Sequence, residues 1–358
     1  MKYSGVQVNR AGRKLLQDNL IENEAEFSAV LDVISYWRSE HDAPLKRAFE
    51  ALQRVALEKD RRAIFAKRLK RVVSIARKLE RFESMDLKNM QDIGGCRAII
   101  TNHKKLQQTL RELKHLPEFR WADGGFRIKD YIENPKADGY RSVHIIGSFL
   151  GDIGARRRIE VQLRTYIQHY WATALEIVDL FTDQALKSNQ GDKEWAVFFQ
   201  NVSEHFALMD DVHIFATMPP RAKLAAYRKR VQGDARLLET AKLIRKCAKN
   251  LRVVDKLGAF AGSLVVVDKQ ITKSNEAGFV LLKINIEKTS VETQVFLSKD
   301  SKQAEAAYIS LESRTAKVEG VVVALVSSTA VGGIKEAYPN YFADSTNFFN
   351  HLSLILEV

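Results

Sequence analysis

The chain has 358 residues, of which 46% are hydrophobic and 28% charged, and it carries a formal net charge of +12 at pH 7. This composition excludes a disordered chain and suits a folded one of two or three domains. No apolar run approaches the roughly 20 residues of a bilayer-spanning helix, and the amino terminus leads into no hydrophobic signal core, so we expect a cytoplasmic protein with no membrane partner. The excess of positive charge favours an anionic partner, either RNA or a nucleotide.

The only two cysteines, Cys96 and Cys247, are far apart in the sequence. This excludes a disulfide framework and a zinc site built mainly from cysteine. We interpret both thiols as reduced core residues.

The first third of the chain is predicted to be mainly helical. Apolar residues recur at helical spacing over residues 13–58, and Pro44 is expected to start the second helix there. His41-Asp42, between the two helices, is interpreted as a capping or surface pair. Residues 61–81 are dense in cations with interleaved apolar residues, which predicts a basic helix with one buried stripe. Cations fixed on such a helix are suited to gripping phosphate.

Two acidic residues stand beside predicted strands. Asp92 precedes a Gly-Gly turn that feeds the apolar strand 96–100. In the strand 158–165, side chains alternate, so that Ile159, Val161 and Leu163 share one face and Arg158, Glu160, Gln162 and Arg164 share the other. That polar face either meets water or carries chemistry. If it carries chemistry, Asp92 and Glu160 could share one Mg²⁺, which takes one or two protein carboxylates.

The order of elements predicts two kinds of domain. A helix with Leu106, Leu110 and Leu113, a strand near Phe126 and a helix over 166–182 complete a mixed α/β domain. No Walker-type loop and no dinucleotide glycine fingerprint occurs. After Pro219-Pro220 a basic helical stretch reaches Arg252. Beyond Gly258 we expect strands at 264–267, 279–286, 291–297 and 321–326, with helices at 302–310 and 345–356, which together form a small α+β binding or regulatory module. The predicted domains are therefore 1–230, a helical connector 231–257, and 258–358.

Several short motifs, in this order, resemble the RelA/SpoT synthetases, pyrophosphokinases that move the β,γ-pyrophosphate of ATP onto a 3′-hydroxyl. They run over about 120 residues of the chain: Arg68, Lys70, Ser74 and Lys78; Asp92-Ile93-Gly94-Gly95-Cys96-Arg97; Lys129-Asp130-Tyr131-Ile132; Gly139-Tyr140-Arg141-Ser142-Val143-His144; and Glu160-Val161-Gln162-Leu163-Arg164-Thr165. The resemblance implies an α/β (α+β) fold, with a nucleotidyltransferase-like mixed sheet flanked by helices and a small C-terminal regulatory domain of the pseudo zinc finger kind.

The resemblance also implies roles for individual residues. Arg68, Lys70, Ser74, Lys78 and Arg97 would bind ATP. Asp92 and Glu160 would hold Mg²⁺, and Glu160 would help to deprotonate the attacking hydroxyl. Tyr140 would stack on the acceptor's base, with His144, Gln162 and Arg164 lining the acceptor pocket. These roles suit pyrophosphoryl transfer, which depends on positioning and on offsetting charge more than on covalent chemistry of the protein.

The complete layout resembles the CapRel group, fused toxin–antitoxin synthetases of bacterial defence against phage, whose antitoxin part carries a Tyr-x-x-Tyr motif. Tyr338 and Tyr341 match that motif and would hold the enzyme inactive; otherwise they are tyrosines packed at a proline turn. By this resemblance a phage major capsid protein binds the C-terminal part and frees the enzyme, which then moves pyrophosphate to the 3′ end of tRNA. We expect a monomer with no DNA partner.

Two other functions stay open from the sequence. One is an alarmone synthetase acting on GDP, GTP or adenine nucleotides. The helix at 166–182 departs from that group, which usually places a Glu-His pair about where Leu175-Glu176 stands. The other is a degenerate synthetase that serves only as a sensor, against which the intact Asp92 and Glu160 argue.

Overall fold

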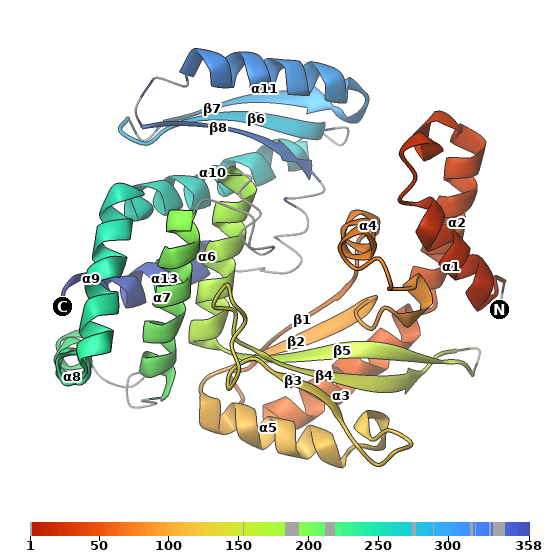
Figure 1. The fold of residues 1–358 in the computed structure, drawn as a ribbon, viewed down its shortest axis with the longest axis horizontal. Coiled ribbons are helices and arrows are strands. Elements are labelled where there is room, and N and C mark those ends of the chain that lie inside the picture. Colours follow the sequence, from red (N-terminus) through yellow and green to blue (C-terminus); the bar gives the residue numbers. More distant parts are fainter. Residues whose placement is uncertain are drawn as a thin grey trace. The chain divides into compact units, whose positions relative to one another are not determined.

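The chain divides into two compact units in the computed structural model: residues 1–132 with 142–165, and residues 133–141 with 166–358. The residues described are 2–152, 154–182, 193–211, 219–273, 277–288, 290–315, 318, 320–328, 331 and 341–358. We describe each unit by itself (Figure 1). This division is based on spatial contacts. It does not test the functional domains predicted from the sequence, which stay a prediction.

The first unit is built on a five-stranded mixed sheet in the order β1-β2-β5-β4-β3. Its strands are β1 (Ile64–Leu69), β2 (Gly94–Ile100), β3 (Arg127–Asp130), β4 (Val143–Leu150) and β5 (Arg156–Thr165). Only β2 and β5 are parallel, and the other neighbours are antiparallel. The expected α+β class with a mixed sheet is confirmed.

One face of this sheet is apolar and covered by two helices. Val161 and Leu163 of β5 and Ala98 of β2 are buried in one core with residues of α3 (Asp42–Lys59) and α5 (His103–His115). The alternation predicted for residues 158–165 is therefore confirmed, because the apolar members are buried and Glu160 and Gln162 lie on the other face.

A second core of the first unit lies among α1 (Gly5–Lys14), α2 (Glu24–Ser39) and α4 (Val72–Arg81). Ile75 and Leu79 of α4 are buried in it, which leaves Ser74 and the basic residues of that short helix outside the core. Three 3₁₀ turns complete the unit: η1 (Asp18–Glu22), η2 (Leu87–Asn89) and η3 (Pro117–Phe119).

The helix expected over residues 61–81 is wrong. Residues 61–81 are a strand followed by a helix, so Arg68 lies on β1 and Lys70 in the connection to α4. Pairing of β1 with β2 overrides the helical spacing of its apolar residues. Gly94 and Gly95, expected as a turn before the strand, are instead the first two residues of β2. The second of the early helices begins at Asp42, so Pro44 lies in its first turn as expected, where the N–H groups have no partner within the helix and proline is tolerated.

The second unit combines helices with a three-stranded antiparallel sheet in the order β7-β6-β8. Its strands are β6 (Ala277–Asn285), β7 (Ser290–Leu297) and β8 (Val321–Ser327), confirming three of the four strands expected beyond Gly258. Its helices are α6 (Tyr166–Thr182), α7 (Lys193–Asp211), α8 (Pro220–Gln232), α9 (Ala235–Asn250), α10 (Val253–Lys273), α11 (Ser301–Thr315) and α13 (Tyr341–Leu356), with the short turn η6 (Ser298–Asp300).

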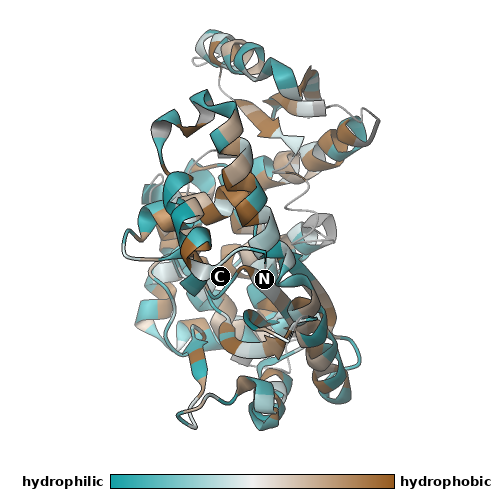
Figure 2. Cartoon of the chain, turned by 90° about the vertical axis from the view of Figure 1, so that its right-hand side faces the viewer, coloured by the Kyte–Doolittle hydropathy of each residue, from teal (hydrophilic) through white to brown (hydrophobic). Residues whose placement is uncertain are grey.

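The fourth expected strand, at 264–267, is wrong: these residues belong to α10, and the predicted boundary at Gly258 falls within the same helix. The run Leu264-Val265-Val266-Val267 is rich in β-branched residues, yet Leu264 and Val267 are fully buried, three residues apart on one helix face. Burial of that face outweighs the strand preference of valine. Hydrophobic and hydrophilic segments alternate along the helices (Figure 2), as expected for helices with one buried stripe.

A single core runs through the second unit. It joins side chains of α6, α7, α9, α10, the small sheet and the C-terminal helix α13. A buried polar contact accompanies this packing, since Nε2 of His169 in α6 lies 3.2 Å from Oδ2 of Asp344 in α13. The C-terminal helix is thus an integral part of the unit that contains α6.

Candidate active site

The polar face of the first sheet gathers most of the predicted site residues. Cross-strand register places Glu160 of β5 opposite Gly95 of β2, which in turn pairs with Arg68 of β1. In the next row, Gln162 of β5 lies between Arg97 of β2 and His144 of β4. Directly paired residues on adjacent strands share a face. The register therefore brings residues from four strands onto one surface.

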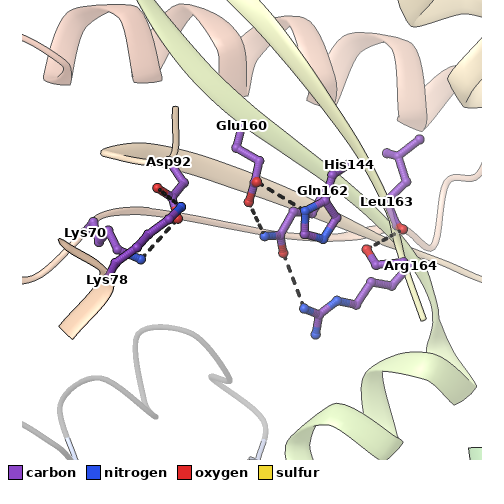
Figure 3. A network of polar contacts seen from close by, with 9 residues as sticks. Lys70, Lys78, Asp92, His144, Glu160, Gln162, Leu163 and Arg164 are labelled. Atoms are coloured by element: carbon purple, nitrogen blue, oxygen red, sulfur yellow. Dashed lines mark hydrogen bonds and ion pairs between the residues drawn. The ribbon is translucent and has the colours of Figure 1, made fainter. Parts of the chain in front are cut away.

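Asp92 is held by two lysines. Nζ of Lys78 donates to Oδ1 at 2.8 Å and Nζ of Lys70 donates to Oδ2 at 3.1 Å, as Figure 3 shows. The backbone explains why the groups meet, because the N–H of Lys70 donates to the carbonyl of Ile93 at 2.7 Å. The carbonyl of Lys70 in turn accepts from Nε of Arg38 at 2.8 Å. The connection after β1 is thus pinned beside Asp92.

The cations around Asp92 repel one another. Burial lowers the pKa of Lys70, Asp92 opposes that shift, and the nearby charges of Lys78 and Arg68 lower the pKa further. Arg68 is exposed and makes no hydrogen bond or ion pair with any residue that the structure describes. Two lysines therefore share one carboxylate beside the charge of Arg68, which leaves an excess of positive charge suited to an anionic ligand.

Glu160 has its own set of partners. Oε2 lies 3.2 Å from Nδ1 of His144, and Oε1 accepts a 2.6 Å hydrogen bond from Nε2 of Gln162. Nη2 of Arg164 donates to Oε1 of Gln162 at 3.3 Å, which fixes the amide so that its N–H₂ faces Glu160. Figure 3 shows this chain of contacts along β5. The ring of Tyr131 meets the His144 ring edge-on at 5.2 Å.

These partners determine the ionisation of Glu160. Burial by itself would raise its pKa, but the His144 contact, the Gln162 amide and the charge of Lys78 outweigh burial and lower the pKa to about 2. Glu160 is therefore ionised at neutral pH. A general base works best with a pKa near the operating pH, so this environment suits a ligand or a charged orienting group better than a strong base.

The two carboxylates fit a magnesium ion by their donor chemistry. Lys78 bonds to Asp92 and also lowers the pKa of Glu160, so both carboxylates lie within electrostatic reach of one ammonium. In the described part of the chain, His, Cys, Asp and Glu form no group of three or more that could hold a metal. Magnesium needs no such group, because one or two carboxylates suffice when water and phosphate supply the remaining ligands.

Residues 67–177 match the family model described as a region found in RelA / SpoT proteins. This RelA/SpoT region contains every predicted site residue except Tyr338 and Tyr341.

Individual relatives share only part of their length with this chain. Over 114 residues it is 31% identical to the GTP pyrophosphokinase YwaC and 30% identical to the GTP pyrophosphokinase YjbM, both of Bacillus subtilis. Each match covers 30% of this chain, and 52% and 51% of the two relatives. The GTP pyrophosphokinase rsh of Brucella ovis is 30% identical over 166 residues, which are 43% of this chain and 21% of that protein. The chain thus covers only about half of the first two relatives.

Solved structures show a weaker likeness. The small alarmone synthetase 2 of Bacillus subtilis gives a TM-score of 0.42 at 20% identity, covering 50% of this chain and 96% of that one.

Within the RelA/SpoT region, the remaining predicted residues differ in their surroundings. Arg97 is buried, whereas Ser74 is exposed on α4, four residues before Lys78 and so on the same helix face. Tyr140 belongs to the second unit, where Nζ of Lys136 lies 4.6 Å from the centre of its ring. Its predicted place at the acceptor's base stays a prediction. Tyr338 lies outside the described residues, as does the side chain of Tyr341, whose backbone begins α13.

Sequence reasoning placed two further side chains of the polar face in a motif but gave them no role at the site. Lys129 of β3 pairs with His144, which places it in the row of Gln162 and Arg97. Tyr131, next but one along the chain, contacts the His144 ring. Residues two apart in a strand face the same side of the sheet, so the spacing of Lys129 and Tyr131 is the sequence signal that could have placed both on the polar face.

Cys96 is confirmed as a core thiol. Burial and the charge of Glu160 raise its pKa, so it stays protonated and unreactive. Cys247 is also buried and free. None of the helices in the described ranges combines the length and the apolar character that crossing a membrane requires.

Proposed function

We propose that the RelA/SpoT region transfers the β,γ-pyrophosphate of ATP to a 3′-hydroxyl. The observation that carries this proposal is the ammonium of Lys78, which bonds to Asp92 at 2.8 Å and whose charge lowers the pKa of Glu160. The family match and the names of the relatives, GTP pyrophosphokinases, support it.

In this proposal the cations around Asp92 receive the triphosphate. Arg68 and Arg97 bind ATP from the sheet, and Lys70 and Lys78 turn from Asp92 to the phosphate oxygens, with Ser74 beside them on α4. Asp92 is then free to hold Mg²⁺ together with Glu160. When bound, the ion supplies positive charge at the phosphate oxygens, which is the chief requirement of phosphoryl transfer.

The reaction forms one bond and breaks one. The oxygen of the acceptor's 3′-hydroxyl bonds to the β-phosphorus of ATP, while the bond from that phosphorus to the oxygen bridging to the α-phosphorus breaks and AMP leaves. The hydroxyl proton passes to Glu160 or to water. A carboxylate with a pKa of about 2 accepts the proton only late, after the oxygen–phosphorus bond has largely formed. This suits a loose transition state, in which the attacking hydroxyl still keeps its proton.

We propose the 3′ end of tRNA as the acceptor. A net charge of +12 supports a polyanionic partner, since binding of RNA is dominated by phosphate contacts. In this proposal His144, Gln162 and Arg164 contact the terminal nucleotide, and Tyr140 stacks on its base. The alternative acceptors are GDP, GTP or an adenine nucleotide, of which the relatives' names favour a guanine nucleotide.

We also propose that the residues after Gly258 restrain the enzyme until a phage protein, the major capsid protein, binds them. The Tyr-x-x-Tyr spacing of Tyr338 and Tyr341 supports this proposal. Because α13 is part of the core that also holds α6, removing the residues after Gly258 would expose that core. Full-length Tyr338→Ala and Tyr341→Ala chains are therefore the better test. They should be toxic to uninfected cells, and toxicity equal to that of the parent would count against restraint.

The transfer itself is tested with ATP labelled at the γ-phosphate. The full chain, with Tyr338→Ala to relieve restraint, is incubated with deacylated tRNA, GDP, GTP or ATP as acceptor. Label on tRNA alone supports the proposal. Label on nucleotides alone contradicts tRNA as the acceptor and supports a nucleotide instead. Label on no acceptor contradicts the proposed transfer.

A Glu160→Gln chain is compared with Glu58→Gln, an exposed residue of α3. Only the first should lose transfer, by about a hundredfold or more.

A further inference from the structure

A cluster of one tryptophan and two arginines extends the polar face beyond Glu160. The guanidinium carbon of Arg127 lies 5.1 Å from the centre of the Trp121 ring, and that of Arg158 lies 5.5 Å from it. Arg158 is two residues before Glu160 on β5 and therefore on the same face. Arg127 pairs with Ile146, which pairs with Glu160. Both arginines thus share the face that carries the candidate chemistry.

Trp121 is held rigidly in place. Its indole N–H donates to the carbonyl of Ile146 at 3.3 Å. Its backbone N–H donates to the carbonyl of Gly125 at 3.1 Å, and its carbonyl accepts from Gly124 at 2.8 Å. Gly124 has a φ of +76°, a conformation that glycine adopts without strain. The ring is therefore a preformed platform at the place where β3 begins.

The two arginines differ in their charge balance. Arg127 forms an ion pair with Asp123 at 2.5 Å, and this pair lowers the pKa of Asp123. Arg158 makes no hydrogen bond or ion pair with any residue the structure describes, and the contact that positions it is with the Trp121 ring. A tryptophan face attracts a guanidinium and orients it while leaving its N–H groups available. The cluster therefore presents one uncompensated, oriented guanidinium.

We infer that Arg158, positioned by Trp121, binds a backbone phosphate of the acceptor RNA next to the nucleotide that reacts at Glu160. This inference rests on the proposed transfer to an RNA 3′ end, and it adds a contact that a mononucleotide acceptor does not need. A guanidinium with free N–H groups matches the geometry of a phosphate. Two residues of strand separate Arg158 from Glu160, about 7 Å, which is similar to the spacing of successive phosphates along a nucleic acid strand.

The test measures RNA binding without requiring turnover. Full-length chains carrying Glu160→Gln are titrated against fluorescent deacylated tRNA by anisotropy at several salt concentrations. Adding Arg158→Gln should weaken binding by about threefold to tenfold and reduce the slope of log K against log salt by about 0.7, as loss of one single-strand phosphate contact predicts.

A matched control is Arg111→Gln, which removes the same charge from α5, an exposed position on the other face of the sheet. It should leave affinity and slope nearly unchanged. If Arg158→Gln and Arg111→Gln behave alike, the inference is wrong whatever the outcome of the transfer assay. If transfer is absent but only Arg158→Gln changes RNA binding, the phosphate contact of Arg158 stands and the proposed activity does not.

The role of Trp121 is tested by two substitutions. Trp121→Leu removes the aromatic face and should reduce the salt slope as Arg158→Gln does, whereas Trp121→Phe keeps a face and should restore most of it. Thermal unfolding would first show that Trp121→Leu and the parent are both folded. Equal slopes of log K against log salt for the two chains would then contradict the positioning role. A loss of GDP binding rather than tRNA binding in Arg158→Gln would assign the residue to a small acceptor and overturn the inference.

Discussion

Nδ1 of His144 lies 3.2 Å from Oε2 of Glu160, and this contact does more than any other single partner to keep the carboxylate ionised against its burial. The pairing crosses from β4 to β5. It means that a residue expected to line the acceptor pocket also determines the charge of the residue expected to hold the metal. His144 thus connects the two halves of the proposed chemistry.

The low pKa of Glu160 predicts a pH-dependent contribution to stability. Its pKa is about 2 in the folded protein against an ordinary 4.5, so the unfolded chain binds the proton more readily. The contribution is fully present above pH 4.5 and is lost as the pH falls toward 2. Between pH 5 and pH 3 the parent should lose roughly 2 kcal/mol more free energy of unfolding than Glu160→Gln. Urea unfolding at each pH measures this, and parallel curves would contradict it.

Lys78 should influence Glu160 without touching it through a hydrogen bond. Its charge lowers the pKa of Glu160, so Lys78→Gln should raise that pKa toward the ordinary value. Titration of the labelled glutamate carboxyl carbons by NMR measures the shift. Arg81→Gln, an exposed cation at the end of the same helix α4, is the matched control and should leave the Glu160 titration in place. An equal shift in both chains would mean that only net charge matters.

Two glycines should respond to alanine in opposite directions. Gly139 has a φ of +91°, and a Cβ there would lie 3.0 Å from both Cα of Gln200 and Cβ of Ser203. Gly139→Ala should therefore lower the free energy of unfolding by about 1 to 3 kcal/mol. Gly258 lies in α10, where an added Cβ would meet nothing within 4 Å, so Gly258→Ala should raise stability by about 0.5 to 1 kcal/mol. Thermal unfolding of both chains checks the signs.

The buried contact between His169 and Asp344 should stabilise the C-terminal helix on α6. Asp344→Ala removes the acceptor from a buried imidazole and should cost about 1 to 3 kcal/mol, while Asp344→Asn keeps an acceptor oxygen and should cost less. Glu357→Gln, exposed near the end of the chain, should cost nothing measurable. Urea unfolding gives the three values. If Asp344→Ala matches Glu357→Gln, the contact does not hold the helix.

Where neighbours in the sequence alone decide the outcome, the predictions agree with the structure. The alternation over 158–165 assigned Glu160 and Gln162 to the polar face, and the helix predicted at 166–182 has the bounds of α6. Both patterns follow from burial of one face of one element, and that periodicity is written in consecutive residues.

Competition between partners distant in the sequence was not predictable in the same way. Arg68 lies on a strand because β1 finds β2 as a partner, and Leu264 lies in a helix because the core of the second unit accepts that face of α10. Neither partner is visible in the local pattern. The role of Trp121 was not predicted for the same reason, since its arginine neighbours come from two different strands.

The sequence by itself therefore determined which residue types are present: two acids beside strands, a dense group of cations, and the spacing that resembles a RelA/SpoT region. Only the tertiary structure decided which of these residues contact one another: Asp92 pairs with Lys70 and Lys78, and Glu160 contacts His144 and Gln162. The physical reason is that electrostatic partners and pKa values depend on distances of a few ångströms across strands. Those distances are set by sheet register and packing, which no single segment of the chain contains.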